Sequence, residues 1–262
     1  MKIISAFTFV HNAIHSGYPI VEAIGAVRPY VDEVVVVDMQ STDNTREVLE
    51  SLANPLYDQE PYYDHVPLEI IDGYWGNRAG ETLRQAHNQY KQCAGEVILH
   101  FEADEVYDEL LIQRIIGYIW SGTDDIAVYR LQLEQNFQRC RWYPEPVHRV
   151  WLKNSDTRKE GHTTNRHNEA FTLSPDAGYL WDITNCFRDN WLNRVNKQAE
   201  LRGEKPNYLM VPVHTSLPSD IGEKEAEQWL YAGKHWTYTS TPFDIPEILK
   251  PLVGMVKYEP SI

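Results

Sequence analysis

The sequence feature that most constrains the fold is a run of four valines, Val34–Val37. β-branched residues favour strands, and a strand without polar alternation is typical of a parallel sheet that is covered on both faces. The valine run lies between two segments whose apolar residues recur at helical spacing, 19–28 and 41–52. A buried strand between two helices indicates an α/β protein.

The alternation of strands and helices continues to about residue 125. Further strands are expected at 3–9, 68–71 and 96–101, and further helices at 80–94 and 108–120. This order predicts a doubly wound, mostly parallel sheet with helices on both faces. In such sheets ligands bind beyond the carboxyl ends of the strands.

The second half of the chain has a mixed pattern. Strands are expected at 126–137, 148–153 and 208–214, and helices at 189–203 and 220–235. Residues 236–262 contain several prolines and are expected to pack on the outside as a tail. We therefore divide a single domain into a ligand-binding half, 1–125, a smaller mixed half, 126–235, and the tail.

Composition limits the partners. Asp and Glu number 38 against 24 Lys and Arg, and the formal net charge of −14 argues against nucleic-acid binding through the general surface. No apolar run reaches the roughly 20 residues of a membrane helix, and the first residues read as a strand rather than a signal peptide. The three cysteines lack metal-ligand or redox spacing and are expected to be free thiols. We expect a cytoplasmic protein without a transmembrane segment, and its oligomeric state stays open.

Three carboxylates, Glu102, Asp104 and Glu105, follow the strand expected at 96–101. Crowded like charges repel, and burial raises the cost of each one. A divalent cation would relieve the repulsion, and oxygen ligands suit Mg²⁺ or Mn²⁺, particularly when phosphates complete the shell. The alternative is a cluster of acids that caps the helix beginning near residue 108.

Two further residues point to a nucleotide. Asp38 ends the valine run, where its carboxylate can accept a hydrogen bond from a ribose or from a base N–H. The alternative, a turn and helix cap, explains the Ser-Thr-Asp sequence at 41–43 better than it explains Asp38. Arg84 lies on a helix expected near the same edge, where it can meet a base or a phosphate, or else pair with Glu81 on the surface.

Four segments together resemble the family-2 glycosyltransferases of the GT-A fold: ISAFTFVHN, EVVVVDMQSTDNTREVL, GETLRQAHNQYKQCAGEVIL and HFEADE. The resemblance covers about residues 1–125 and implies a GT-A-type α/β fold that binds a UDP-sugar. It implies that residues of the first two strand ends hold the uridine and that an arginine before the metal motif touches the nucleotide. These residues are Thr8, Phe9, Asn12 and Asp38 for the uridine, and Arg84 for the nucleotide.

The metal motif of this family is usually Asp-x-Asp, and here it reads Glu102-Ala103-Asp104. The resemblance implies that Asp104 binds Mn²⁺ or Mg²⁺ through the donor diphosphate. Glu102 departs from the common pattern, and its longer side chain is expected to reach a ribose, or the ion through a water molecule. Ala103 is the small residue between the two acids and belongs to the same donor-binding segment.

Beyond residue 125, three short segments look similar to bacterial lipopolysaccharide-core-type members of the family: WYPEPVHRVWLKN, GHTTNRHNEA and VPVHTS. They suggest a histidine that completes the metal shell, and His214, which follows an apolar strand, is the first choice. His148, His162 and His167 compete with it. The alternative for each is a surface histidine or a hydrogen-bonded core histidine.

The implied reaction moves a hexose such as glucose from the UDP-sugar to a hydroxyl of an unknown sugar or glycan acceptor, with inversion. The divalent ion stabilises the charge that develops on the diphosphate. Inversion needs a carboxylate that takes the proton of the acceptor. Glu169 is the first choice because it lies between polar loop residues and Phe171, Asp182 is the second, and Glu145 is the third.

Three other functions fit parts of the pattern. A sugar-phosphate nucleotidyltransferase has a related fold, but such enzymes usually open with a Gly-rich loop and a basic residue, which SAFTFVHN lacks. A phosphate-transferring or hydrolytic metal enzyme would use the acids without needing Asp38 and Arg84. A non-catalytic carbohydrate-binding protein would explain the eight tryptophans but not the metal motif.

Overall fold

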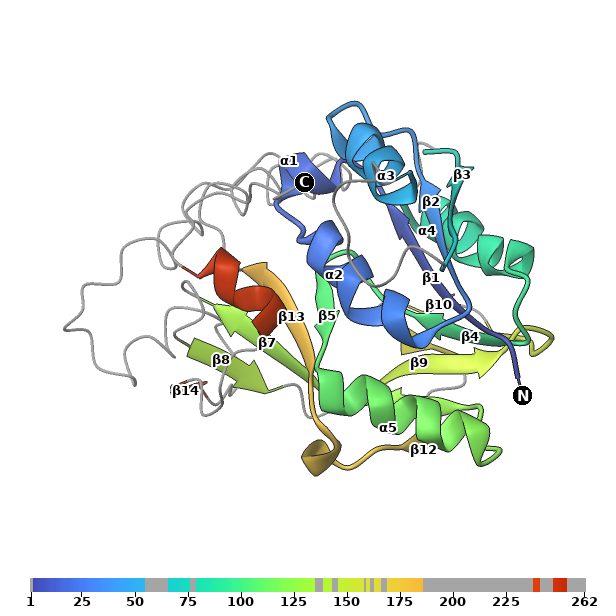
Figure 1. The fold of residues 1–262 in the computed structure, drawn as a ribbon, viewed down its shortest axis with the longest axis vertical. Coiled ribbons are helices and arrows are strands. Elements are labelled where there is room, and N and C mark those ends of the chain that lie inside the picture. Colours follow the sequence, from blue (N-terminus) through green and yellow to red (C-terminus); the bar gives the residue numbers. More distant parts are fainter. Residues whose placement is uncertain are drawn as a thin grey trace.

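A seven-stranded sheet forms the centre of the molecule (Figure 1). The computed structural model describes residues 2–54, 66–75, 79–134, 139–142, 146–157, 159–160, 163–165, 169–185, 238–240 and 247–253. The α-helices are α1 (Ala13–Ser16), α2 (Ile20–Val27), α3 (Thr45–Ala53), α4 (Ala79–Asn88) and α5 (Glu109–Trp120). The 3-10 helices are η1 (Arg28–Tyr30), η2 (Gln89–Gln92), η3 (Pro175–Ala177) and η6 (Glu247–Leu252).

The strands of the first half are β1 (Ile4–Val10), β2 (Glu33–Asp38), β3 (Leu68–Asp72), β4 (Val97–His100) and β5 (Glu105–Tyr107). Those that follow are β6 (Ile126–Val128), β7 (Arg130–Glu134), β8 (Arg139–Trp142), β9 (Val147–Leu152), β10 (Lys159–Glu160), β11 (Thr163–Thr164), β12 (Phe171–Thr172), β13 (Leu180–Asn185) and β14 (Tyr238–Ser240). The expected alternation up to residue 125 is therefore present, with β5 as an additional short strand.

The order of the strands in the main sheet is β12-β6-β9-β4-β1-β2-β3. Every neighbouring pair is parallel except the two pairs made by β9, which runs against β4 on one side and against β6 on the other. The prediction of a mostly parallel α/β sheet is confirmed. The carboxyl ends of β1, β2 and β4 lie at one edge, because Val10 pairs with Asp38 and Phe7 pairs with His100.

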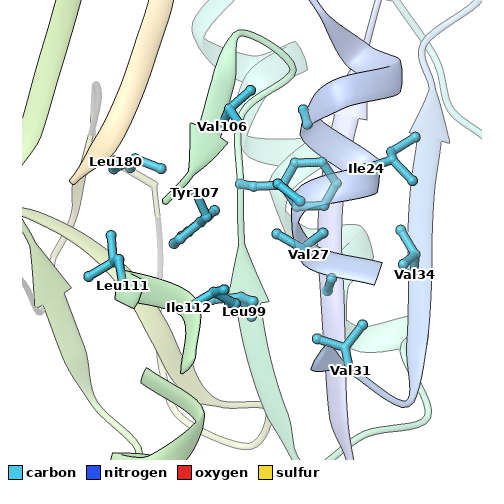
Figure 2. Close-up of a cluster of buried hydrophobic side chains, with 14 of the residues drawn as sticks. Ile24, Val27, Val31, Val34, Leu99, Val106, Tyr107, Leu111, Ile112 and Leu180 are labelled. Atoms are coloured by element: carbon cyan, nitrogen blue, oxygen red, sulfur yellow. The ribbon is translucent and has the colours of Figure 1, made fainter. Parts of the chain in front are cut away.

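The valine run of β2 is buried on both faces, as its composition predicts. Val34 and Val36 belong to one apolar cluster together with side chains of α2, α3 and α5, and the other two valines belong to a second cluster with side chains of α4 and η2. Figure 2 shows part of the first cluster, in which Val27 of α2 and Ile112 of α5 point into the same apolar layer. Helices therefore cover both faces, as expected of a doubly wound sheet.

A second sheet, in the order β14-β8-β7-β13-β5, follows from the mixed half of the chain. The single strand expected at 126–137 is wrong, because residues 126–128 form β6 of the main sheet and residues 130–134 form β7 of the second sheet. The chain changes sheets at Tyr129. Both strands keep the same alternation of residue types, so the pattern alone does not reveal the change.

Two pieces of the expected tail are described. Residues 238–240 form β14, which pairs with β8 in the second sheet, while Leu249 and Leu252 of η6 are buried in the first apolar cluster. These pieces contribute to the fold itself rather than only covering it. Three expected elements lie outside the described residues: the helices at 189–203 and 220–235 and the strand at 208–214. Within the described part of the chain, no helix has both the length and the apolar character needed to cross a membrane.

Candidate functional site

The carboxyl edge of the main sheet brings together the segments that follow β1 and β2. The Asn12 N–H donates to Ser41 Oγ at 2.9 Å, and the Asn12 side-chain Oδ1 accepts from the Thr42 N–H at 2.6 Å. Asn12 has a φ of 52°, a left-handed conformation that Asn tolerates better than most residues. The two strand ends that were expected to hold a uridine are therefore in contact with each other.

Asp38 is buried at the end of β2. Its Oδ1 accepts a hydrogen bond from the Ser41 N–H at 3.0 Å, and its Oδ2 lies 3.8 Å from Nη1 of Arg46. Asp38 thus holds the backbone of the segment that follows β2. A carboxylate has about four acceptor positions, so this one keeps capacity for a ligand.

Thr8, Phe9 and Arg84 differ in their surroundings. Thr8 is buried, and within the described residues its Oγ1 has no hydrogen-bond partner. Phe9 is half-buried, and its ring stacks on that of His100 with 6.0 Å between the centroids. Arg84 is exposed on α4, the helix that contributes to the second apolar cluster. Of the three, Thr8 offers the clearest unused polar group near the strand ends, since buried polar atoms are normally paired.

A tight turn after β4 holds the three expected acids, and we call residues 102–105 the acid turn. The Glu105 N–H donates to the Glu102 carbonyl at 2.9 Å, and the Glu102 N–H donates to Oε2 of Glu105 at 3.2 Å. The Asp104 carbonyl accepts from the Ile183 N–H of β13 at 2.8 Å. Ala103 and Glu105 are buried, whereas Glu102 and Asp104 are partly exposed.

The buried carboxylate of Glu105 is paired with an arginine from β9. Arg149 donates from Nε to Oε2 at 3.0 Å and from Nη2 to Oε1 at 2.6 Å, which makes a bidentate ion pair. Its Nη2 also lies 3.6 Å from Oε1 of Glu102. Burial disfavours the charge on Arg149, but the charges of Glu105 and Glu102 outweigh it, so the pKa of this guanidinium lies above its ordinary value. Arg149 therefore offsets part of the crowded negative charge of the acids.

Asp182, the second choice for the base, lies in the same buried network. It pairs with Glu105 across β13 and β5, and its Oδ2 lies 3.5 Å from Nη1 of Arg130. The same Nη1 lies 3.6 Å from Oε1 of Glu105. All three side chains are buried, with Asp182 only 3% exposed. A buried carboxylate beside an arginine is a structural charge, and this geometry does not favour Asp182 as the base.

Glu169, the first choice for the base, is not brought to this edge. It is exposed and precedes β12, whose Phe171 pairs with Ile126 at the start of β6. Through Val150, Ile126 is level with Leu99 of β4, so Glu169 precedes a point level with Leu99, whereas Asp104 follows the carboxyl end of β4. β12 is also the outermost strand of the sheet, three positions from β4, so the fold does not bring Glu169 to the acid turn.

His148 is buried and uses both ring nitrogens in the core. Its Nδ1 bonds with Oγ1 of Thr164, and its Nε2 lies 2.5 Å from Oδ1 of Asp125. This is the hydrogen-bonded core histidine that was weighed as the alternative, and not a metal ligand. The remaining candidates for the metal and for the base lie outside the described residues: His162, His167, His214 and Glu145.

The acid turn fits a cation only if phosphates share it. Among the described residues, no three His, Cys, Asp or Glu side chains converge as a metal cage. Glu102 and Asp104 are the partly exposed oxygen donors, since Arg149 occupies Glu105. Four carboxylates at −4 and two guanidinium groups at +2 leave a formal charge of −2: Glu102, Asp104, Glu105 and Asp182, with Arg130 and Arg149. Two oxygen donors and this residual charge suit a divalent ion whose shell a diphosphate completes.

Two arginines that offset part of the charge of the acids were not predicted from the sequence. Each stands within a mostly apolar segment, Arg149 within VHRVWL and Arg130 within AVYRLQL. A charged residue in such a strand is almost never fully buried without a partner, so each arginine signals a carboxylate elsewhere in the core. That signal does not say which carboxylate, and only the fold supplies the answer.

Comparison with known proteins places the chain in a family. The family model described as glycosyl transferase family 2 matches residues 5–196. An uncharacterized glycosyltransferase of Rickettsia felis is 31% identical over 149 residues, which cover 55% of this chain and 44% of that relative. The chain thus spans less than half of the length of the curated relative that it matches.

Solved structures are also similar. Residues 1–349 of S. aureus TarS align with a TM-score of 0.46 and 17% identity, covering 88% of this chain and 69% of that chain. A glucosyl-3-phosphoglycerate synthase from Mycobacterium tuberculosis, in complex with Mn²⁺, UDP and glucosyl-3-phosphoglycerate, aligns with a TM-score of 0.35 and 16% identity, covering 49% and 44%. The family match covers well over half of the sequence and confirms the resemblance of its first half, so the chain belongs to glycosyl transferase family 2.

Proposed function

We propose that this chain is a metal-dependent glycosyltransferase that moves a hexose such as glucose from a UDP-sugar to a hydroxyl of a sugar or glycan acceptor. Membership of the family supports the transfer of a sugar. The observation that carries the nucleotide and the metal is the carboxyl edge, where buried Asp38 and the partly exposed acids Glu102 and Asp104 follow parallel strands. The expected cytoplasmic location remains part of the proposal.

In this proposal the nucleoside binds at the ends of β1 and β2. Asp38 accepts the N–H of the uracil ring, and Thr8 Oγ1 gains a hydrogen-bond partner from the donor. Phe9 and Asn12 line the same strand end, and Arg84 meets the nucleotide from α4. A buried carboxylate that selects a base N–H gives a preference for uridine over bases without that donor.

The acid turn holds the metal. Asp104 is the principal ligand of the ion, and Glu102 reaches the ion or the ribose. Ala103, between the two acids, has a small side chain that leaves room for the donor. A bound divalent ion stabilises the charge that develops on the leaving diphosphate. The chain itself supplies a rigid turn, because hydrogen bonds fix the Glu102 N–H and the Asp104 carbonyl.

We also propose that the reaction inverts the anomeric configuration. Inversion requires a base that lies beside the sugar acceptor and takes the proton of its hydroxyl. The geometry favours neither Asp182, which is buried against Arg130, nor Glu169, which precedes the outermost strand β12, three positions from β4. Glu145 is the remaining candidate of the three. Proton NMR of the anomeric coupling in the product tests inversion, and retention of the donor configuration would remove the need for this base.

Calorimetry with UDP tests the metal and the nucleotide together. We expect UDP to bind in Mn²⁺ and to lose roughly 10–100-fold in affinity in EDTA, and we expect Asp104→Asn to cause a similar loss. Glu109→Gln is the matched control, because Glu109 is an exposed carboxylate on α5 outside the acid turn. If UDP binds with equal affinity in Mn²⁺ and in EDTA, the proposed metal dependence is wrong. If Asp104→Asn and Glu109→Gln lose the same UDP affinity, Asp104 is not the metal ligand.

A further inference from the structure

Arg149 occupies a β-bulge in β9. Val150 pairs with Ile126 and His148 pairs with Ala127, so two successive residues of β6 face three of β9, and Arg149 is the extra one. A β-bulge bends its strand and re-aims the side chain of the extra residue, and such bulges are frequent beside active sites. The bulge explains how a charged side chain leaves an otherwise apolar strand.

The neighbouring side chains show the break in alternation. Val147 and Val150 both belong to the first apolar cluster, although residues three apart in a regular strand point to opposite faces. His148 and Trp151 lie together on the other face, with 5.5 Å between their ring centroids. Arg149 lies at the break in this alternation, and its guanidinium extends to Glu105.

Glu105 joins this arginine to the backbone of the acid turn. Its Oε2 accepts from Arg149 Nε at 3.0 Å and from the Glu102 N–H at 3.2 Å, so one oxygen links the two. Its Oε1 accepts from Arg149 Nη2 at 2.6 Å, and that same nitrogen lies 3.6 Å from Glu102 Oε1. The guanidinium thus contacts the acid turn through Glu105 and also lies near Glu102, one of its two partly exposed acids.

We propose that Arg149 is a positioning residue for the acid turn. Through Glu105 it fixes the backbone that presents Glu102 and Asp104, and through its approach to Glu102 it restrains that side chain beside Asp104. The contacts described above are enough to support the role of Arg149 in holding the turn. The effect of Arg149 on the binding of a metal ion rests on the proposed function. Partners of this kind behind a metal site typically change metal affinity by about 10–100-fold when they are altered.

Arg130 is a matched control within the same buried network. It is also a buried arginine, and its Nη1 lies 3.6 Å from Oε1 of Glu105 and 3.5 Å from Oδ2 of Asp182. Lysine keeps the charge at either position but replaces the planar fork with a single flexible ammonium group. Arg149→Lys should therefore loosen the turn, whereas Arg130→Lys should lower stability without moving the exposed acids.

Hydrogen exchange of the unliganded protein tests the turn directly. Two amides report on the acid turn: the Glu102 N–H lies within it, and the Ile183 N–H donates to its Asp104 carbonyl. In Arg149→Lys we expect both amides to exchange faster, when their rates are compared with the rates of the amides in α5. In Arg130→Lys their exchange should change only in proportion to the melting temperature. Unchanged protection of both amides in Arg149→Lys, or the same loss in both variants, would overturn the positioning role.

Calorimetry with Mn²⁺ and UDP then tests the consequence. Arg149→Lys should lose about 10–100-fold in Mn²⁺ affinity and regain the parental kcat at saturating Mn²⁺, whereas Arg130→Lys should keep the parental affinity. If Arg149→Lys does not fold, Glu105→Gln/Arg149→Met removes both buried charges together and should show the same loss. A parent that binds no UDP would reject the proposed function, while the exchange result would still decide the positioning role.

Discussion

Asp38 lies directly opposite Asp72 in the parallel register of β2 and β3, and one guanidinium serves both carboxylates. Arg46 Nη1 lies 2.5 Å from Oδ1 of Asp72 and 3.8 Å from Oδ2 of Asp38. The side chain of Asp38 is 6% exposed and that of Asp72 is 86% exposed. Like charges opposite each other on neighbouring strands repel, so the arginine stabilises this edge. The two acids share a partner and a register position but differ in burial.

This difference provides a control for nucleotide selection. We expect Asp38→Ala to erode the preference for uridine over adenosine nucleotides by about 1–3 kcal/mol, because the uracil N–H then loses its acceptor and adenine has no such ring N–H to offer. Asp72→Ala removes the exposed acid and leaves Asp38 in place, so it should keep the preference. Competition binding with the set of nucleoside diphosphates measures both. If Asp38→Ala discriminates as well as the parent, Asp38 serves only the turn that it forms with Ser41.

Asp182 is expected to matter for stability and not for chemistry. Asp182→Asn removes a charge that faces Arg130 at 3.5 Å inside the protein, and a weakened buried pair should lower the free energy of unfolding by about 1–3 kcal/mol. Denaturant unfolding measures this loss, and kcat of the folded enzyme at low temperature should stay near the parental value. A fall in kcat of about 10²–10⁴-fold without a loss of stability would instead identify Asp182 as the base.

Sequence patterns located the main sheet and its carboxyl edge because local residue types encode both. The buried valines of β2 and the abrupt appearance of acids after β4 are properties of short segments, and the helices on both faces follow from their spacing. Family resemblance then suggested the roles that we propose for Asp38 and the acid turn.

Long-range contacts could not be predicted in the same way. Arg149 and Glu105 are 44 residues apart, and their contact depends on β9 entering the sheet antiparallel between β4 and β6 and on a bulge at one residue. Glu169 was chosen for its polar neighbours, but its distance from the acid turn is set by the pairing of β12 with β6 at the far side of the sheet. Neither the contact between Arg149 and Glu105 nor the position of Glu169 can be predicted from the neighbouring residues in the sequence.

Close packing at Gly95 gives a prediction about the start of β4. A Cβ at this position would lie 2.8 Å from the Ser5 nitrogen and 2.9 Å from the Ile3 carbonyl oxygen, and backbone atoms there cannot move aside easily. Gly95→Ala should therefore lower the free energy of unfolding by about 1–3 kcal/mol. Gly117→Ala is the control, because a Cβ there meets nothing within 4 Å, and alanine within α5 should stabilise by about 0.5–1 kcal/mol. Thermal melts of the two variants should shift in opposite directions.

The burial of His148 makes stability depend on pH. Burial lowers the pKa of His148, and the neighbouring carboxylate of Asp125 only partly opposes this. An unfolded histidine takes up a proton near pH 6.5, whereas the folded one resists it, so below about pH 6.5 the unfolded state binds more protons. Stability should therefore rise with pH through this window and fall as the pH drops below it.

A substitution that cannot titrate should weaken this dependence. Urea unfolding of the parent between pH 7.5 and pH 5 should show stability falling with acid, and His148 contributes at most about 1.4 kcal/mol per pH unit to that slope. His148→Gln lowers stability at every pH, because Gln fills the site poorly, but its slope should be shallower than that of the parent. His15→Gln, at an exposed position on α1, is the surface control for the substitution itself. Equal slopes for the parent and His148→Gln would show that His148 does not set the response to acid.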